Sequence, residues 1–507
     1  MTNHLFDGLF GQVDPAKPLA ILPNDGQWTY RDALDFSAKL ANTLIQFGVQ
    51  PGDRVAVQAP KSIEAVLLYI ACVRIGAVFL PLNTAYTGSE VSYFLGDSGA
   101  NLLVCDPKDA DAYADMAGQL QCRLETLGGT AEDGLATGSL IKAAAKADYT
   151  LDNVARKPND LAAILYTSGT TGRSKGAMLT HDNLLSNSMA LKQLWQFSKS
   201  DVLLHALPIF HTHGLFVAVN VTLLSGGSMI FLPGFNLDAM IELLPRATSL
   251  MGVPTFYTRL LDDPRFTRDL VAHMRLFVSG SAPLLAETHI QFEERTGHRV
   301  LERYGMTETN MNTSNPYEGE RRAGTVGFPL PGVQVRICDP DTNNEVGASE
   351  VGMIEVSGPN VFSGYWNMPE KTAAEFRDDG FFITGDLGKV DEEGYLHIVG
   401  RSKDLIISGG LNIYPKEIEL VLDDQQGVLE SAVVGVPHPD FGEAVVAVVV
   451  PSGDGLKPDV LAEGIRPLLA RFKHPKLIEI VDELPRNTMG KVQKNVLRNQ
   501  LKETFSN

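Results

Sequence analysis

The sequence predicts an α/β fold with a large N-terminal domain and a small α+β domain at the C-terminus. Through the first four hundred residues, helical stretches alternate with short apolar runs, which is typical of parallel sheets covered by helices. Between about 324 and 400 the pattern changes to short strands and turns, which indicates a β-rich subdomain. A further α+β stretch of about a hundred residues is long enough for an independent domain. We therefore expect domains at residues 1–402 and 403–507.

The first elements have well-marked ends. Apolar periodicity over residues 31–47 predicts a helix that ends at Gly48, since glycine is favoured just after a helix end. DRVAVQA and AVFLPL read as strands around a helix over 63–75. The apolar run that contains this helix is broken by Glu64, Arg74 and Gly76, so it predicts a buried helix followed by a strand, not a membrane span.

The later strands repeat this pattern of short apolar runs. In the N-terminal part they are NLLVCDP, DLAAILYTSG, DVLLHALP, GSMIFLP and RLFVSGS, and in the β-rich part VQVRICDPD, GMIEVSGPN and GYLHIVG. In the C-terminal domain Pro415 opens a helix in IYPKEIELVLDD, because proline is tolerated in a first helical turn. ESAVVGV, AVVAVVVP and KLIEIVD are predicted strands, and DVLAEGIRPLLARF (459–472) is a predicted helix.

Composition excludes several classes of function. A net charge of −18 over 507 residues argues against a general nucleic-acid binder and against a polybasic membrane anchor. The four cysteines form no CxxC pattern, so we expect reduced thiols and neither disulfides nor a zinc site. The N-terminus lacks the charged start and long apolar core of a signal peptide, and we expect a cytoplasmic protein without membrane or nucleic-acid partners.

The stretch YTSGTTGRSKGAM (166–178) carries the strongest functional signal. Its glycines allow the backbone to approach a ligand closely, its successive amides suit an anion, and Lys175 adds a point charge. The Walker A pattern does not fit, because Ser174 precedes this lysine and Gly176 follows it. The stretch predicts a phosphate-binding loop, and a flexible surface loop is the alternative.

Four further stretches carry polar residues in suggestive places: LERYGMTETN (301–310), FITGDLG (382–388), GRSKDLIISGGLNIYPKEIE (400–419) and LPRNTMGKVQK (484–494). Thr307 and Glu308 suit a phosphate oxygen and Mg²⁺, with a helix N-cap and a solvated side chain as the alternative. Asp386 suits the two hydroxyls of a ribose, or simply a turn. Arg401 and Lys491 are basic residues near glycines, and solvated side chains are the alternative for both.

Together, in this order and spacing, the five stretches resemble the adenylate-forming superfamily of acyl-CoA synthetases, adenylation domains and firefly-type luciferases, over essentially the whole chain. The resemblance implies an N-terminal domain of two α/β subdomains plus a distorted β-barrel, which binds ATP and a carboxylate, and a small mobile α+β lid. It also implies that the acid attacks the α-phosphorus of ATP with Mg²⁺ present, and that CoA then takes the acyl group. CoA is expected instead of a carrier protein because no carrier domain follows in this sequence.

The resemblance also implies the roles of individual residues. Lys491, Thr307, His211 and Lys175 form the catalytic set, Glu308 and Thr170 hold the metal, and Lys403 is the hinge. Ser408, Gly409 and Gly410 line the route of CoA. Lys491 is also the expected target of a lysine acetyltransferase and a deacetylase. The nucleotide-binding set is Thr167, Ser168, Gly169, Thr170, Thr171, Gly172, Lys175, Gly280, Ser281, Ala282, Glu302, Arg303, Tyr304, Gly305, Met306, Thr307, Asp386, Arg401 and Lys491.

Four stretches bear on which acid is activated: HALPIFHTHGLFVA, MGVPTFYTRLL, ERYGMTETNMNTSNPY and ISGGLNIYPKEIE. They resemble the malonyl-CoA synthetase subgroup, which implies that the acid is malonate. A second carboxylate cannot be buried unpaired without a penalty of several kcal/mol, and the fork of an arginine matches it. By resemblance Arg259 takes this role with Ser281, His211 and Met306 assisting, and Arg303 is the competitor.

Three other functions are alternatives to a malonate ligase. A short- or branched-chain monocarboxylate CoA ligase would keep its activity when Arg259 is replaced. A non-catalytic nucleotide-binding protein would be expected to lack Lys491, Glu308 or Asp386, and all three are present. A luciferase-like monooxygenase would need a different acyl pocket. Methylmalonate is an expected additional substrate, since one methyl group changes binding by only ~1–3 kcal/mol.

Overall fold

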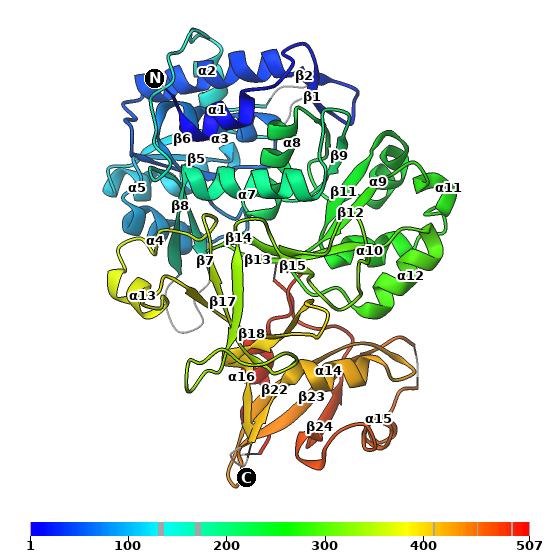
Figure 1. Cartoon of the computed structure of the whole chain (residues 1–507). Helices are drawn as coiled ribbons and strands as arrows, with labels where there is room; N and C mark the ends of the chain where they lie inside the picture. The colour runs from blue at the N-terminus through cyan, green and yellow to red at the C-terminus, as the bar shows by residue number, and fades with distance from the viewer. Residues whose placement is uncertain are drawn as a thin grey trace. The chain divides into compact units, whose positions relative to one another are not determined.

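A computed structural model describes residues 2–129, 136–167, 174–408, 411–453, 455–487 and 490–505. The chain forms two compact units, one of residues 1–334 with 356–382 and the other of residues 335–355 with 383–507. Figure 1 shows mixed helices and strands in both, so the predicted α/β class is confirmed. The predicted boundary between residues 402 and 403 stays a prediction.

A six-stranded sheet forms one part of the first unit, in the order β6-β5-β3-β4-β7-β8. All neighbours are parallel except β7 and β8, which pair antiparallel. The strands are β3 (Arg54–Gln58), β4 (Val78–Pro81), β5 (Leu102–Cys105), β6 (Arg123–Thr126), β7 (Leu161–Thr167) and β8 (Lys175–Thr180). The accompanying helices are α2 (Tyr30–Gln46), α3 (Ile63–Ile75), α4 (Gly88–Ser98), α5 (Ala110–Gln119) and α6 (Ser139–Ala144).

Helix α3 illustrates how the local sequence sets these elements. The Ser62 side chain accepts a hydrogen bond from the Ala65 amide, and the helix ends at Gly76, whose φ of +73° favours glycine. All thirteen residues between these caps are buried. The helix therefore lies inside the unit, as its nearly continuous apolar sequence predicted.

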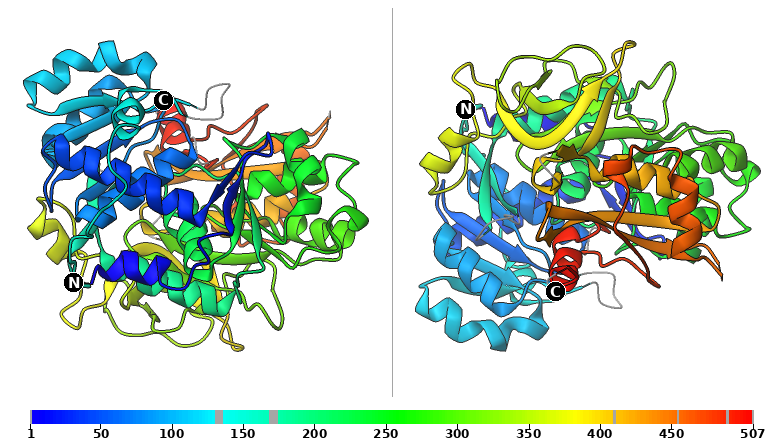
Figure 2. Two further views of the ribbon diagram at one scale, coloured as in Figure 1. Left: turned by 90° about the horizontal axis from the view of Figure 1, so that it is seen from above. Right: turned by 90° about the horizontal axis from the view of Figure 1, so that it is seen from below.

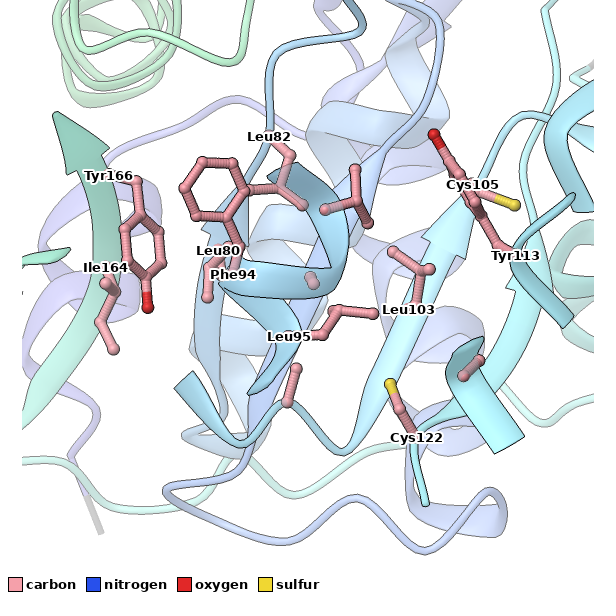
Figure 3. Packing of buried hydrophobic residues seen from close by; sticks show 14 of the residues in the cluster. Leu80, Leu82, Phe94, Leu95, Leu103, Cys105, Tyr113, Cys122, Ile164 and Tyr166 are labelled. Atoms are coloured by element: carbon pink, nitrogen blue, oxygen red, sulfur yellow. The ribbon is translucent and has the colours of Figure 1, made fainter. Parts of the chain in front are cut away.

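The core beside this sheet depends on helix α4. Phe94 is 1% exposed, and its ring centroid lies 4.6 Å from that of Tyr166 on β7. Leu80, Leu103 and Ile164 from three strands belong to the same cluster (Figure 3).

We expect Phe94→Ala to lower the free energy of unfolding by about 3–5 kcal/mol, because the lost ring leaves a cavity in a close-packed core. The three tryptophans, Trp28, Trp195 and Trp366, all lie in the first unit, so urea unfolding followed by their fluorescence measures this effect. The matched control is Met189→Ala, which removes a side chain that is 55% exposed and should change the value by less than about 0.5 kcal/mol. Equal effects of the two substitutions would contradict the prediction.

A nine-stranded sheet forms the rest of the first unit, in the order β15-β14-β13-β12-β11-β9-β10-β1-β2. Its central strands are parallel, and β2, β14 and β15 pair antiparallel at the two edges. The strands are β1 (Pro18–Ile21), β2 (Gln27–Thr29), β9 (Val202–His205), β10 (Ser228–Phe231), β11 (Ser249–Gly252), β12 (Leu276–Ser279), β13 (Leu301–Met306), β14 (Asn310–Ser314) and β15 (Phe328–Pro329).

Helices complete this part of the unit, and Figure 2 shows the green ones beside strands of the same colour. The helices of this part are α1 (His4–Phe10), α7 (His181–Leu194), α8 (Asn220–Ser225), α9 (Leu237–Leu243), α10 (Pro254–Leu261), α11 (Arg268–Val271) and α12 (Ala286–Thr296). Helix α13 (Pro369–Ala374) instead follows a stretch beside the six-stranded sheet, where the Trp366 indole donates to the Asp97 carbonyl of α4. Within the described ranges, none of the protein's helices combines the length and the apolar character that crossing a bilayer needs.

The predicted β-rich stretch forms a four-stranded sheet in the order β16-β17-β18-β19. Most of this sheet belongs to the second unit, and the distorted β-barrel that the resemblance implies stays a prediction. Its strands are β16 (Gln334–Cys338), β17 (Gly352–Ser357), β18 (Phe382–Val390) and β19 (Leu396–Arg401).

The C-terminal sheet is buried on both faces, which explains its unbroken apolar sequence. Along β23, Val445, Ala447 and Val449 pack into one cluster with helices α14 and α15, and the alternate residues pack into another with α16. The elements are β20 (Ile406–Ser408), β21 (Leu411–Ile413), α14 (Pro415–Asp423), β22 (Val428–His438), β23 (Gly442–Pro451), α15 (Pro458–Ile465), β24 (Leu477–Ile480) and α16 (Lys494–Leu501).

One predicted element is wrong in length. The helix expected over residues 459–472 ends at Ile465, and only a 3₁₀ turn, Arg471–Lys473, follows. Pro467 explains the early end, because proline lacks an amide hydrogen and its ring clashes with the preceding helical turn. The apolar spacing continues beyond this proline, so the apolar pattern alone predicted a helix that was too long.

Candidate active site

The predicted acid-binding residues gather at one edge of the nine-stranded sheet. His211 follows β9, Ser281 follows β12, and Arg303 lies in β13. These three strands run parallel in the sheet, with β11 between β9 and β12. Loops at the carboxyl ends of parallel strands commonly bind ligands, so the topology brings together residues that are far apart in the sequence.

A tight hairpin between β13 and β14 presents Thr307 and Glu308. Met306 pairs with Asn310 across it, and the Thr309 amide donates to the Met306 carbonyl at 3.2 Å. A Cβ atom at Gly305 would lie 1.9 Å from the Asn310 carbonyl oxygen, so this position requires glycine. The N-cap alternative for Thr307 is wrong, because a strand follows and no helix does.

The predicted phosphate loop connects β7 and β8, and Thr167 pairs with Lys175 at its base. Ser168, Gly169, Thr170, Thr171 and Gly172 lie outside the described residues. The Lys175 Nζ lies 3.2 Å from Oε1 of Glu375 and 4.0 Å from the centroid of the Tyr365 ring. The lysine that is predicted to grip phosphate therefore already contacts a carboxylate.

A tyrosine hydroxyl joins this ion pair to the predicted metal ligand. The Tyr365 oxygen lies 2.6 Å from Oε2 of Glu375 and 3.1 Å from Oε1 of Glu308. Burial raises the pKa of Glu308, and nearby Lys175 opposes that rise. Burial also acts to raise the pKa of Glu375, but Lys371, Tyr365 and Lys175 together hold it below its ordinary value. Neither Tyr365 nor Glu375 was predicted from the sequence.

Arg303 is a buried cation with unused hydrogen-bonding capacity. It is 4% exposed, and its Nε and Nη2 have no hydrogen-bond partner among the described residues. Burial lowers its pKa to about 9, although Tyr257 acts in the opposite direction, so the guanidinium stays charged at neutral pH. Gly280 makes room for it, since a Cβ there would lie 2.2 Å from the guanidinium carbon. An unpaired charge at such depth calls for an anion.

Two polar residues lie near this arginine. The Ser281 hydroxyl lies 3.3 Å from Nδ1 of His213, and Ser281 has a φ of +71°. Burial lowers the pKa of His213 far below its ordinary value, and Arg303 lowers it further, so its imidazole is neutral. His213 was not predicted, although it is the second histidine of PIFHTHG. It begins a π-helical turn, His213–Val219, and such turns are frequent at functional sites.

The remaining predicted acid ligands are less enclosed. Arg259 lies on the exposed face of α10, with its guanidinium carbon 5.4 Å from the Phe235 ring centroid. Tyr257, two residues earlier, points inward and donates to the Val278 carbonyl at 2.6 Å. His211 is half-buried, with its ring 4.6 Å from that of Phe210, and Met306 is half-buried at the hairpin.

Three other members of the predicted nucleotide set lie in β13 or in the loop after β12. Glu302 is buried, with its carboxylate 3.6 Å from Nδ1 of His289 on α12. Tyr304 is buried opposite Thr313 of β14, and Ala282 is half-buried in the loop after β12.

The second unit holds the predicted ribose ligands as cross-strand neighbours. Asp386 on β18 pairs with Arg401 on β19, and Oδ1 of the aspartate lies 3.0 Å from Nε of the arginine. Asp386 is 4% exposed, and its amide donates to the Thr384 hydroxyl at 3.1 Å. The simple-turn alternative for Asp386 is wrong, because this residue lies within a strand.

The predicted hinge and lid residues also belong to the second unit. Lys403 lies in the 3₁₀ turn Ser402–Asp404, where Asp404 is held by Arg498 of α16 at 2.7 Å. Ser408 ends β20, and Gly409 and Gly410 lie outside the described residues. Lys491 is exposed, and its backbone exchanges two hydrogen bonds of 2.9 Å with Asn487.

Comparison with known proteins agrees with this arrangement. The family described as AMP-binding enzyme matches residues 11–366, and the AMP-binding enzyme C-terminal domain matches residues 417–491. A crystal structure of ATP-bound MatB from Rhodopseudomonas palustris is 57% identical, with a TM-score of 0.97 and full coverage of both chains.

Two curated relatives are similar over most of their length. A malonate–CoA ligase of Arabidopsis thaliana is 35% identical over 487 residues, which is 90% of this chain and 79% of the plant protein. A feruloyl-CoA synthase of Amycolatopsis is 37% identical over 479 residues, covering 93% of each chain. These relatives act on different acids, so similarity along the whole chain does not by itself select the acid.

Proposed function

This chain belongs to the AMP-binding enzyme family, and from that membership we propose that it is an ATP-dependent ligase that joins malonate to coenzyme A. The products are malonyl-CoA, AMP and pyrophosphate. The observation that carries the choice of malonate is Arg303, a buried cation at the acid-binding edge of the sheet, two of whose nitrogens have no hydrogen-bond partner in the described part of the chain. Similarity to MatB and to a malonate–CoA ligase supports the same choice.

The reaction has two half-reactions. In the first, a malonate oxygen bonds to the α-phosphorus of ATP and the bond to the leaving pyrophosphate breaks. In the second, the CoA sulfur bonds to the acyl carbon, AMP leaves with the bridging oxygen, and the thiol proton is released. The protein contributes mainly positioning and charge neutralisation, as in other phosphoryl transfers. Lys175 and Thr307 would contact the phosphates, Asp386 and Arg401 the ribose, and Lys491 the attacking carboxylate.

Glu308 would hold the magnesium ion together with Thr170. Magnesium in nucleotide sites takes one or two carboxylates, several waters and substrate phosphates, and a buried glutamate next to a phosphate-binding lysine fits that pattern. When bound, the ion neutralises negative charge on the phosphates.

An arginine would pair with the second carboxylate of malonate. Arg259 was predicted for this role, and it lies on the exposed face of α10, with its guanidinium carbon 5.4 Å from the Phe235 ring centroid. Arg303 has stronger support, because it is buried beside Ser281 and His213, and two of its nitrogens lack hydrogen-bond partners within the described ranges. A monocarboxylate with an apolar chain would leave this charge unpaired, which disfavours the monocarboxylate ligase.

Pyrophosphate release across a panel of acids tests the proposal. We expect malonate to give the highest kcat/KM, methylmalonate to follow within about 10–200-fold, and acetate and butyrate to be poor. Without CoA, release should stop after about one equivalent per active site. Pyrophosphate release that favours butyrate over malonate would establish the monocarboxylate ligase instead.

Further expectations accompany this function. A cytoplasmic location and acetylation of Lys491 by an acetyltransferase, reversed by a deacetylase, stay predictions. The hinge role of Lys403 and the CoA route along Ser408 stay predictions as well.

A further inference from the structure

We propose that Glu375 is an internal counter-ion that holds Lys175 until the triphosphate of ATP displaces it, and that Tyr365 fixes the carboxylate for this exchange. The inference rests on the proposed function, because it takes Lys175 as the ligand of the terminal phosphates. It adds a positioning residue that the phosphate-loop motif does not contain. All the residues concerned lie in the first unit.

The two carboxylate oxygens of Glu375 have different partners. Oε1 lies 3.2 Å from Nζ of Lys175 and 2.6 Å from Nζ of Lys371, while Oε2 lies 2.6 Å from the Tyr365 hydroxyl. One oxygen therefore serves two ammonium groups. Lys175 is 18% exposed and Glu375 19%, so solvent screens their attraction only in part.

Tyr365 is itself held firmly. Its amide donates to the Thr372 hydroxyl at 2.9 Å, and its ring lies 4.8 Å from that of Phe362. The same ring lies under the Lys175 ammonium, which adds a cation–π contact to the ion pair. Because its hydroxyl also reaches Glu308, one rigid side chain contacts both the counter-ion and the predicted metal ligand.

The physical consequence is selection among anions. An ammonium group with no partner attracts any phosphate, whereas a paired one must first give up its carboxylate. The terminal phosphates of ATP carry more charge and more acceptor oxygens than a single carboxylate, so they compete well. AMP has no β- or γ-phosphate to offer. Glu375 thus lowers the affinity of Lys175 for every phosphate ligand. The triphosphate still binds, because it makes the strongest interactions with the lysine.

Calorimetric binding of magnesium with a non-hydrolysable ATP analogue tests the proposal on the full-length protein. We expect Glu375→Gln to lower the Kd of the analogue about tenfold, which corresponds to about 1.4 kcal/mol, because the competitor is gone. Lys371→Ala should raise the Kd, since Lys175 is then the one lysine among the described residues that pairs with Glu375. Tyr365→Phe should lower the Kd less than Glu375→Gln. With ATP as substrate, Glu375→Gln should lower KM without raising kcat.

The matched control is Glu370→Gln on the same helix, α13. It removes the same charge from an exposed residue that forms no ion pair within the described part of the chain, so its Kd should match that of the wild type. Unchanged or weaker binding by Glu375→Gln would overturn the proposal and would make Glu375 a supporting ligand of the lysine. The ratio of the Kd values of Glu375→Gln and the wild type does not test the proposed function. Failure of the wild type to form malonyl-adenylate would contradict that function.

Discussion

Replacing Lys491 by alanine is expected to lower the rate of acyl-adenylate formation by about 10²–10³-fold, or about 2.7–4 kcal/mol of transition-state stabilisation. The lysine is predicted to contact the carboxylate oxygen as it bonds to phosphorus, so its charge acts mainly in the transition state. KM for ATP should change little, because the predicted phosphate ligands remain. Pyrophosphate release in a single turnover measures this step.

The second half-reaction separates this role from a general loss of structure. When malonyl-adenylate is supplied, Lys491→Ala should transfer the acyl group to CoA at nearly the wild-type rate. Lys502→Ala, which removes another exposed lysine of the same unit, should leave both half-reactions unchanged. Equal loss in both steps would contradict an adenylation-specific role. Lys491→Gln should behave like the alanine variant, since acetylation removes the same charge.

The helices and strands were largely predictable because burial leaves a periodic record in the sequence. Helix α3 was predicted with its observed ends, because its apolar run stops at Gly76, which caps the helix. The strands of the C-terminal sheet were predictable from their apolar, valine-rich runs, because both faces of the sheet are buried. The helix after residue 458 was overextended because apolar spacing carried more weight than Pro467.

The site was predictable only where a short motif contains the chemistry. Asp386 and Arg401 were both identified, and they prove to be paired across two strands. Tyr365 and Glu375 were missed because contacts between distant residues leave no local signal. Tyr365 lies 57 residues from Glu308, and Glu375 lies 200 residues from Lys175. The burial of Arg303 was equally hidden, since the sequence does not state which way a strand residue points.

The second large effect is expected at Arg303. Arg303→Met should lower kcat/KM for malonate by at least about 10²-fold, because removing one partner of a buried charge pair costs about 3–5 kcal/mol. Use of butyrate should fall far less or rise, since the methionine fills a similar volume without charge. Arg259→Ala is the matched comparison on the exposed face of α10. If only Arg259→Ala lost malonate use, Arg259 would be the partner of the second carboxylate, and the assignment to Arg303 would be contradicted.

Stability measurements on the same variant distinguish binding from folding. In the ligand-free protein, two guanidinium nitrogens of Arg303 are buried with no partner among the residues that the structure describes, so their desolvation is uncompensated. Arg303→Met should therefore unfold at the same or a higher urea concentration than the wild type, although it no longer binds malonate. Malonate should stabilise the wild type and leave the variant unchanged, because only a ligand that binds the folded state shifts the unfolding equilibrium. A variant that is less stable without ligand would mean that Arg303 supports the fold, and the buried charge would then need no substrate to explain it.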